Sequence, residues 1–193
     1  MPAQQAVFVR LGRSVGMGSL MGLSNTGQAA GLLAGSLAGA SVVAARAAFG
    51  MLAGVERCAL AAAIPTRAGT AVLLDAGATV ECRPQHLVQF AVMGTAFARQ
   101  ALGIARPAVG LVSIGEEETK GNELTREAHQ RLKLAPVRFI GNIEGRDIYS
   151  GGADVIVCDG FTGNVVLKTS EGLVELVETL LGEQLQGTFS SQM

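Results

Sequence analysis

Apolar and polar positions follow a regular alternation from residue 71 onward. Short apolar runs rich in β-branched residues and bounded by glycines are typical of buried strands, and the longer amphipathic stretches between them have a helical period. The pattern predicts strands at 71–75, 109–114, 137–141 and 154–158 and helices at 85–102, 122–134 and 165–181, while 59–63 fits either element. Strands that alternate with helices predict a fold of the α/β class with a mostly parallel sheet covered on both faces.

The last predicted helix is amphipathic. Apolar residues occupy one stripe and glutamates the opposite face, which is typical of a helix that packs one side against a core. The stripe contains Val166, Leu173, Leu176, Val177, Leu180 and Leu181.

The segment DGFTGN, residues 159–164, connects the last predicted strand to this helix. Gly160 and Gly163 allow the backbone to approach a ligand closely, and Thr162 and Asn164 can cap the helix or donate a hydrogen bond. A helix start also offers unpaired N–H groups to an anion. The alternative is a plain connection in which these residues serve only the geometry of the turn.

The first part of the chain has a different character. Residues 1–24 show no stable periodicity and are interpreted as a tail or an incomplete first element, so the domain is predicted at 25–193. An Ala-rich helix is predicted from Asn25 to about Ala48, with glycines at every fourth position that suit a closely packed buried helix or a membrane helix. The absence of acidic residues before Glu56 leaves a transit peptide or a misread start codon open.

The composition of the chain argues against several classes of function. The 193 residues are 49% hydrophobic and 16% charged with a net charge of -1, which argues against a nucleic-acid partner, since phosphates need a basic face. Cys58, Cys82 and Cys158 have no metal-ligand spacing, so we predict a reducing compartment and no metal. No motif for a serine nucleophile, a nucleoside triphosphate or a dinucleotide occurs, and no cofactor is predicted.

Polar residues follow three of the predicted strands. Because the carboxyl ends of parallel strands share one edge of a sheet, the loops after Asp75, Ile114 and Cys158 are expected to border one cleft. Lys120, just before Gly121, can neutralise an anion there, although a solvated surface loop is the alternative. Asp75 could cap a turn, orient Lys120 or face a substrate. His86 and His129 are interpreted as surface or packing residues, and a site role is the alternative for His86, which follows Pro84 near a helix start.

Several long segments resemble the bacterial phosphate acyltransferases of the PlsX type. The resemblance covers roughly Val55 to Leu181 and extends more weakly to SNTG at 24–27, although the Asp-Ala-Met-Gly-Gly-Asp signature that begins the family is absent. Its main segments are LLDAGATVECRPQHLVQFAVMG (73–94), VSIGEEETKGNELTREAHQRLK (112–133) and FIGNIEGRDIYSGGADVIVCDGFTGNVVLKTSEGL (139–173), with IPTRAGT at 64–70.

The resemblance implies a three-layer α/β/α sandwich of the isocitrate dehydrogenase type. It also implies a homodimeric enzyme, cytoplasmic or peripherally bound to the membrane, that makes acyl phosphate from long-chain acyl-acyl carrier protein and inorganic phosphate. The product supplies a glycerol-3-phosphate acyltransferase in phospholipid biosynthesis. One alternative is a truncated homologue that binds acyl chains, carrier protein or a partner subunit without catalysis, and another is a phosphotransacetylase that uses acyl-coenzyme A.

The family motifs also imply site residues. Lys120 and Asn164 correspond to the proposed catalytic pair, the lysine holding phosphate and the asparagine stabilising the oxyanion, and both are expected to face one hollow. The expected substrate-binding residues are Asn25, Thr26, Gly27, Asp75, Gly160, Thr162 and Gly163.

Overall fold

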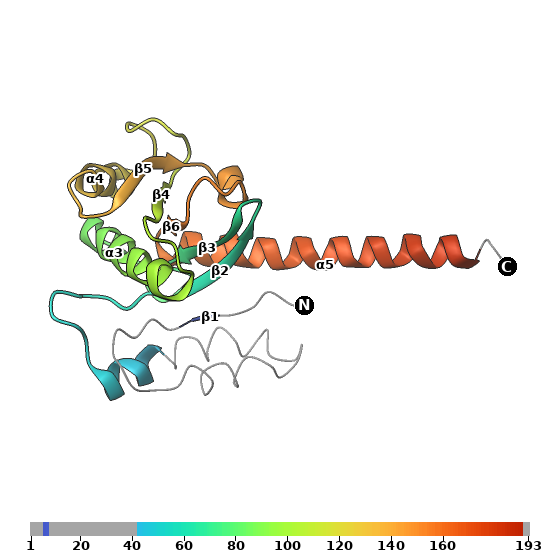
Figure 1. The fold of residues 1–193 in the computed structure, drawn as a ribbon, viewed down its shortest axis with the longest axis horizontal. Helices are drawn as coiled ribbons and strands as arrows, with labels where there is room; N and C mark the ends of the chain where they lie inside the picture. Colours follow the sequence, from blue (N-terminus) through green and yellow to red (C-terminus); the bar gives the residue numbers. More distant parts are fainter. Residues whose placement is uncertain (1–5, 8–41, 191–193) are drawn as a thin grey trace.

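The fold centres on one six-stranded sheet, seen in a computed structural model that describes residues 6–7 and 42–190 (Figure 1). The order across the sheet is β1-β2-β3-β6-β4-β5. The strands are β1 (Ala6–Val7), β2 (Ala61–Thr66), β3 (Gly69–Leu74), β4 (Ala108–Val112), β5 (Arg138–Ile143) and β6 (Val155–Val157). The helices are α3 (Pro84–Ala101), α4 (Glu123–Leu132) and α5 (Gly160–Ser190), with a 3-10 helix η2 at Gly145–Tyr149.

The predicted parallel arrangement is confirmed for β3, β6, β4 and β5, which pair in parallel across the sheet. The remaining pairings, β1 with β2 and β2 with β3, are antiparallel. The ambiguous segment 59–63 enters β2, where Ala62 pairs with Leu73 of β3. The predicted α/β class is therefore correct. At one edge of the parallel sheet, β1 and β2 add two antiparallel strands.

Two apolar clusters cover the two faces of the sheet. On one face Val72, Leu74, Leu111 and Val155 pack with buried residues of α3 and α4. On the other face the cluster includes Ile148 of η2, with Val166 and Leu167 of α5 packed against it. Burial of both faces explains why β3, β4 and β6 are continuously apolar rather than alternating.

Helix α5 differs most from the sequence prediction. It begins at Gly160 rather than at 165, because the Asp159 carboxylate accepts a hydrogen bond from the Thr162 N–H, 2.9 Å away, and caps the first turn. It then extends as a single long rod away from the sheet (Figure 1). The apolar residues of the stripe from Leu173 to Leu181 are 45% to 60% exposed, so this part of the amphipathic helix does not pack against the sheet.

The amino-terminal part lies mostly outside the described residues. Residues 42–49 are helical, at the end of the predicted Ala-rich helix, and Ala6–Val7 pairs with β2. In the part of the chain that the structure describes, no helix is both long and apolar enough to cross a bilayer.

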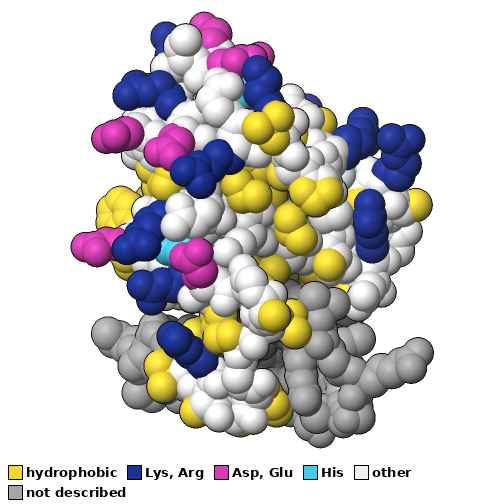
Figure 2. Space-filling view, turned by 90° about the vertical axis from the view of Figure 1, so that its left-hand side faces the viewer, with side chains coloured by type: hydrophobic (Ala, Val, Ile, Leu, Met, Phe, Trp, Pro, Cys, Tyr) yellow, Lys and Arg dark blue, Asp and Glu magenta, His cyan; other side chains and the backbone are white. Residues whose placement is uncertain are grey.

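The surface on the α3 and α4 side of the molecule carries charges of both signs. Figure 2 shows acidic and basic side chains intermixed along one side of this face, with hydrophobic side chains between them. Surface ion pairs contribute to this mixture, among them Arg131 with Glu127 and Lys133 with Glu118. This face therefore does not present a uniformly basic field to a partner.

Candidate functional site at the carboxyl ends of the strands

Three loops meet at one edge of the parallel sheet, as the sequence pattern predicts. Strand β6 lies between β3 and β4, and the three run in the same direction. The segments that follow them, 75–83, 113–122 and 158–159, therefore leave the sheet side by side. This edge is where open α/β folds bind ligands.

Asp75, at the end of β3, is fully buried and holds its own loop. Its two carboxylate oxygens accept hydrogen bonds from the backbone N–H groups of Leu60, Gly77, Ala78 and Thr79, at 2.6 to 3.2 Å. Burial raises the pKa of the Asp75 carboxyl, and these four N–H donors act in the opposite direction. Of the three roles that the sequence leaves open for Asp75, the geometry supports the capping of its own loop. Contact of Asp75 with a substrate stays a prediction.

The two glycines at the start of α5 allow that helix to lie directly on the Asp75 loop. A Cβ atom at Gly163 would overlap the Asp75 carbonyl oxygen, and one at Gly160 would lie 2.6 Å from the Thr79 carbonyl oxygen. Side chains at these positions are incompatible with the packing of backbone on backbone. These contacts give both glycines a structural role, while ligand binding by them stays a prediction.

The N–H groups expected to be open to an anion at this helix start are largely engaged. The Gly160 N–H bonds to the Thr79 carbonyl, the Thr162 N–H to the Asp159 carboxylate and the Gly163 N–H to the Asp159 carbonyl. The Thr162 hydroxyl also donates to the Asp159 carboxylate. The expectation of a bare helix N-terminus is therefore wrong, since Asp159 caps it and its carboxylate opposes an anion at this end of the helix.

Asn164 lies on the second turn of α5 with an exposed side chain. A Cβ atom at Gly77 would lie 3.5 Å from the Asn164 Cβ and 3.6 Å from its Oδ1, so the amide is against the loop that follows β3. Gly77 has φ +130°, a backbone conformation that favours glycine. Among the bonds of the described residues, none occupies the Asn164 side chain, and its amide is available to a ligand.

Lys120 is exposed in the loop after β4. Its N–H bonds to the Glu117 carbonyl at 3.0 Å, closing a turn, and its Cγ is 2.9 Å from where a Cβ of Gly115 would be. Nearby Glu118 is directed elsewhere, because its carboxylate accepts a 2.6 Å bond from Lys133 that lowers the pKa of Glu118. Within the described residues no carboxylate is at ion-pair distance from the Lys120 ammonium group, which is free to meet an anion.

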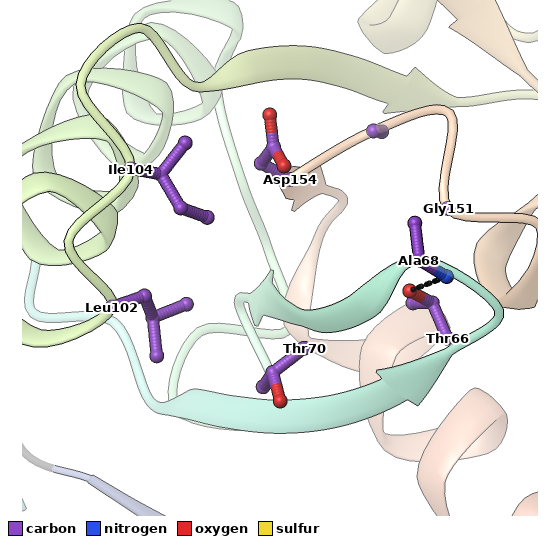
Figure 3. Close-up of a pocket in the computed structure, with 8 residues that line it drawn as sticks. Thr66, Ala68, Thr70, Leu102, Ile104, Gly151 and Asp154 are labelled. Atoms are coloured by element: carbon purple, nitrogen blue, oxygen red, sulfur yellow. Dashed lines mark hydrogen bonds between the residues drawn. The ribbon is translucent and has the colours of Figure 1, made fainter.

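Two surface hollows of the described chain lie at the opposite edge of the sheet. One, of about 330 Å³, is bordered by Leu102 and Ile104 on one side and Ala68 on the other (Figure 3). The second, of about 310 Å³, is bordered by Arg99, Arg106 and Arg138. Neither is at the carboxyl edge, so a shared hollow between Lys120 and Asn164 stays a prediction. In the described segments no group of three His, Cys, Asp or Glu side chains is placed to hold a metal.

The other residues that the sequence analysis considers are the segment 25–27 and the two histidines. Asn25, Thr26 and Gly27 lie outside the described residues. His86 is buried at the start of α3, accepts from the Arg83 N–H and lies 3.2 Å from Glu56, which agrees with a structural role. His129 is also buried, and it lies against Asn142. Asn142 was not predicted as a functional residue, because it follows the predicted strand 137–141 and belongs to no motif.

The fold is that of phosphotransacetylases. The structure is similar to the EutD phosphotransacetylase from Staphylococcus aureus, with a TM-score of 0.54 and 18% identity over 70% of this chain and 48% of that one. A phosphotransacetylase from Streptococcus pyogenes matches with a TM-score of 0.51 and 19% identity over 64% of this chain and 44% of that one. At this level of identity the likeness establishes a three-layer α/β/α fold.

Sequence comparison adds the family. The family model described as "Fatty acid synthesis protein" matches residues 1–193, and the chain belongs to that family. It is 49% identical to the phosphate acyltransferase of Acidobacterium capsulatum over 99% of this chain and 56% of the relative, and 44% identical to that of Pelotomaculum thermopropionicum over 97% and 55%. The chain thus spans about half the length of the curated relatives that it matches.

Proposed function

We propose that this chain provides the phosphate-binding part of an enzyme that forms acyl phosphate from a long-chain acyl-acyl carrier protein and inorganic phosphate. The relatives named phosphate acyltransferase support the reaction. The observation that carries the proposal is the exposed Lys120 in the loop after β4, whose ammonium group has no ion-pair partner among the described residues. Strand β4 is adjacent to β6, which leads to the Asn164 amide at the start of α5.

The proposed chemistry needs no covalent enzyme intermediate. A phosphate oxygen attacks the thioester carbonyl carbon, the carbon–sulfur bond breaks, and the carrier protein leaves as a thiolate that takes up a proton. Lys120 holds the phosphate dianion as a point charge, and the Asn164 amide donates to the carbonyl oxygen as it becomes negative. Because Asp159 caps α5, the lysine supplies most of the positive charge in this arrangement.

Replacing Lys120 tests the proposal. With acyl-acyl carrier protein and phosphate as substrates, Lys120→Ala is expected to lower kcat/KM by about 10²-fold or more, and Asn164→Ala by about 10² to 10³-fold. Lys133→Ala is the matched control, since it removes a nearby lysine whose ammonium is paired with Glu118. Activity that survives in Lys120→Ala, or that is absent from the folded unmodified chain, counts against the proposal. Equal turnover with acyl-coenzyme A would indicate a phosphotransacetylase instead.

The proposed assembly is a homodimer with peripheral membrane contact that supplies acyl phosphate to a glycerol-3-phosphate acyltransferase. The exposed stripe of α5 supports association, since Leu173, Leu176, Leu180 and their neighbours recur at the spacing of a helix–helix seam. A second helix with the same spacing would bury this stripe.

A further inference from the structure

The loop that carries Lys120 is connected to a buried polar pair on the α4 side of the sheet. His129 of α4 and Asn142 of β5 are 3% and 6% exposed, and the His129 Nδ1 lies 2.8 Å from the Asn142 Oδ1. The imidazole also packs edge-on against Phe139, with ring centroids 5.0 Å apart. The large majority of buried polar side chains are hydrogen-bonded in this way.

An irregularity in β5 directs Asn142 toward α4. The register between β4 and β5 shifts at Gly141, so that Val109 pairs with Phe139 but Leu111 pairs with Asn142. Side chains alternate between the two faces of a strand, and the extra residue places Asn142 on the same face as Leu111, toward α4. Gly141 has φ +106°, which permits the bulge.

The two hydrogen bonds of Asn142 fix its orientation. Its Nδ2 donates to the Glu117 carbonyl at 2.9 Å, so its Oδ1 must accept from His129. The His129 Nδ1 therefore carries a proton, while its Nε2 lies 3.9 Å from the Glu118 carboxylate. A flipped amide would set its oxygen against the Glu117 carbonyl oxygen, and is excluded by repulsion.

The Glu117 carbonyl is the point where this pair meets the loop. It accepts both the Asn142 amide and the Lys120 N–H, so one oxygen joins the sheet to the turn that presents the lysine. We propose that Asn142, oriented by His129, is a positioning residue that holds the 117–120 turn and thereby places the Lys120 ammonium for phosphate. This inference rests on the proposed function, in which Lys120 binds phosphate.

Two kinds of variant separate anchoring from general stability. Asn142→Asp keeps the size and the acceptor for His129 but removes the N–H donor to Glu117. His129→Leu removes the donor that orients Asn142, whereas His129→Asn places an amide N–H near the position of Nδ1 and is the conservative rescue. Glu118→Gln is the matched control, since it changes the same loop without touching the Glu117 carbonyl.

Hydrogen exchange at the Lys120 amide and steady-state kinetics are the two measurements. Asn142→Asp and His129→Leu are expected to speed exchange of that amide about tenfold, the factor expected for loss of one loop-closing hydrogen bond. The KM for phosphate is expected to rise about tenfold while the KM for the acyl donor stays within about twofold, because only Lys120, the residue that binds phosphate, moves. His129→Asn and Glu118→Gln are expected to behave like the unmodified chain.

The outcomes separate the anchoring of the 117–120 turn from the binding of phosphate by Lys120. Unchanged exchange in both Asn142→Asp and His129→Leu overturns the inference. Faster exchange with an unchanged KM for phosphate supports the anchoring and rejects Lys120 as the phosphate ligand. A loss of kcat without a selective rise in the KM for phosphate indicates a merely structural role and also overturns the inference. If Asn142→Asp does not fold, the two His129 variants decide.

Discussion

Replacing Gly163 with alanine tests the contact on which the candidate site is built. Gly163 is the buried point where α5 lies on the end of β3, and an added Cβ would overlap the Asp75 carbonyl oxygen, lie 2.9 Å from the Asp75 carbonyl carbon and 3.1 Å from the Cys158 sulfur. Two of these three neighbours are backbone atoms, which cannot rotate away as a flexible side chain could. The helix start must therefore move.

The expected loss of stability follows from two opposing effects. Overpacking a well-packed contact costs about 1 to 3 kcal/mol, occasionally more. Alanine in place of glycine inside a helix returns about 1 kcal/mol. Movement of the helix start also weakens the Gly160 bond to Thr79 and the packing of Val166 and Leu167. A net destabilisation of about 2 kcal/mol is expected, which lowers Tm by roughly 4 to 8 °C for a chain of this size.

Gly172 provides the matched control on the same helix. No atom lies within 4 Å of a Cβ added there, so Gly172→Ala should only raise helicity and leave the domain at least as stable. Urea unfolding followed by circular dichroism gives both values, with an unchanged slope showing that the unfolded states are comparable. If Gly163→Ala is as stable as the unmodified chain, the close packing of α5 on the Asp75 loop is refuted.

Three further predictions concern the same structure. Asp75→Ala is expected to destabilise the chain by more than about 3 kcal/mol, measured by urea unfolding, because four backbone N–H groups lose their acceptor; a smaller loss would show that water replaces the carboxylate. Burial raises the pKa of the Cys82 thiol to about 11, so alkylation of a variant with Cys82 as its only cysteine should accelerate about tenfold per pH unit up to that value, and a plateau near pH 9 would contradict it. Since the folded chain holds this proton more tightly, stability should fall as pH rises from 9 toward 11. The double variant Leu176→Glu/Leu180→Glu should abolish self-association in analytical ultracentrifugation, whereas Glu175→Gln should not; a dimer that survives the double variant locates the interface elsewhere.

Much of the fold was predictable because local sequence carries it. The runs in β3, β4 and β6 are short, mostly apolar and contain β-branched residues, and the helices between them have a clear period, so strand, helix and edge all follow from residue spacing. The same spacing places Lys120 and Asn164 at one edge of the sheet, since parallel strands that alternate with helices send their connecting loops to the same side.

Other features depend on contacts between segments far apart in the chain. Spacing alone could not show that Asp75 captures the N–H of Leu60, that Asp159 occupies the N–H groups at the start of α5, or that a bulge at Gly141 turns Asn142 toward His129. These are choices among several partners for one polar group, and only the folded backbone brings the chosen partner within reach.

The apolar stripe of α5 also shows which property the sequence determines and which one the tertiary structure decides. Its period determines that one face of the helix is apolar, and that property belongs to the sequence. Whether the face is covered depends on which surfaces meet, because burial is a relation between segments rather than a property of one. In the tertiary structure the apolar face of α5 is exposed to solvent. The same structure brings His129 to Asn142, and Asn142 to the carbonyl of Glu117 in the loop that carries Lys120.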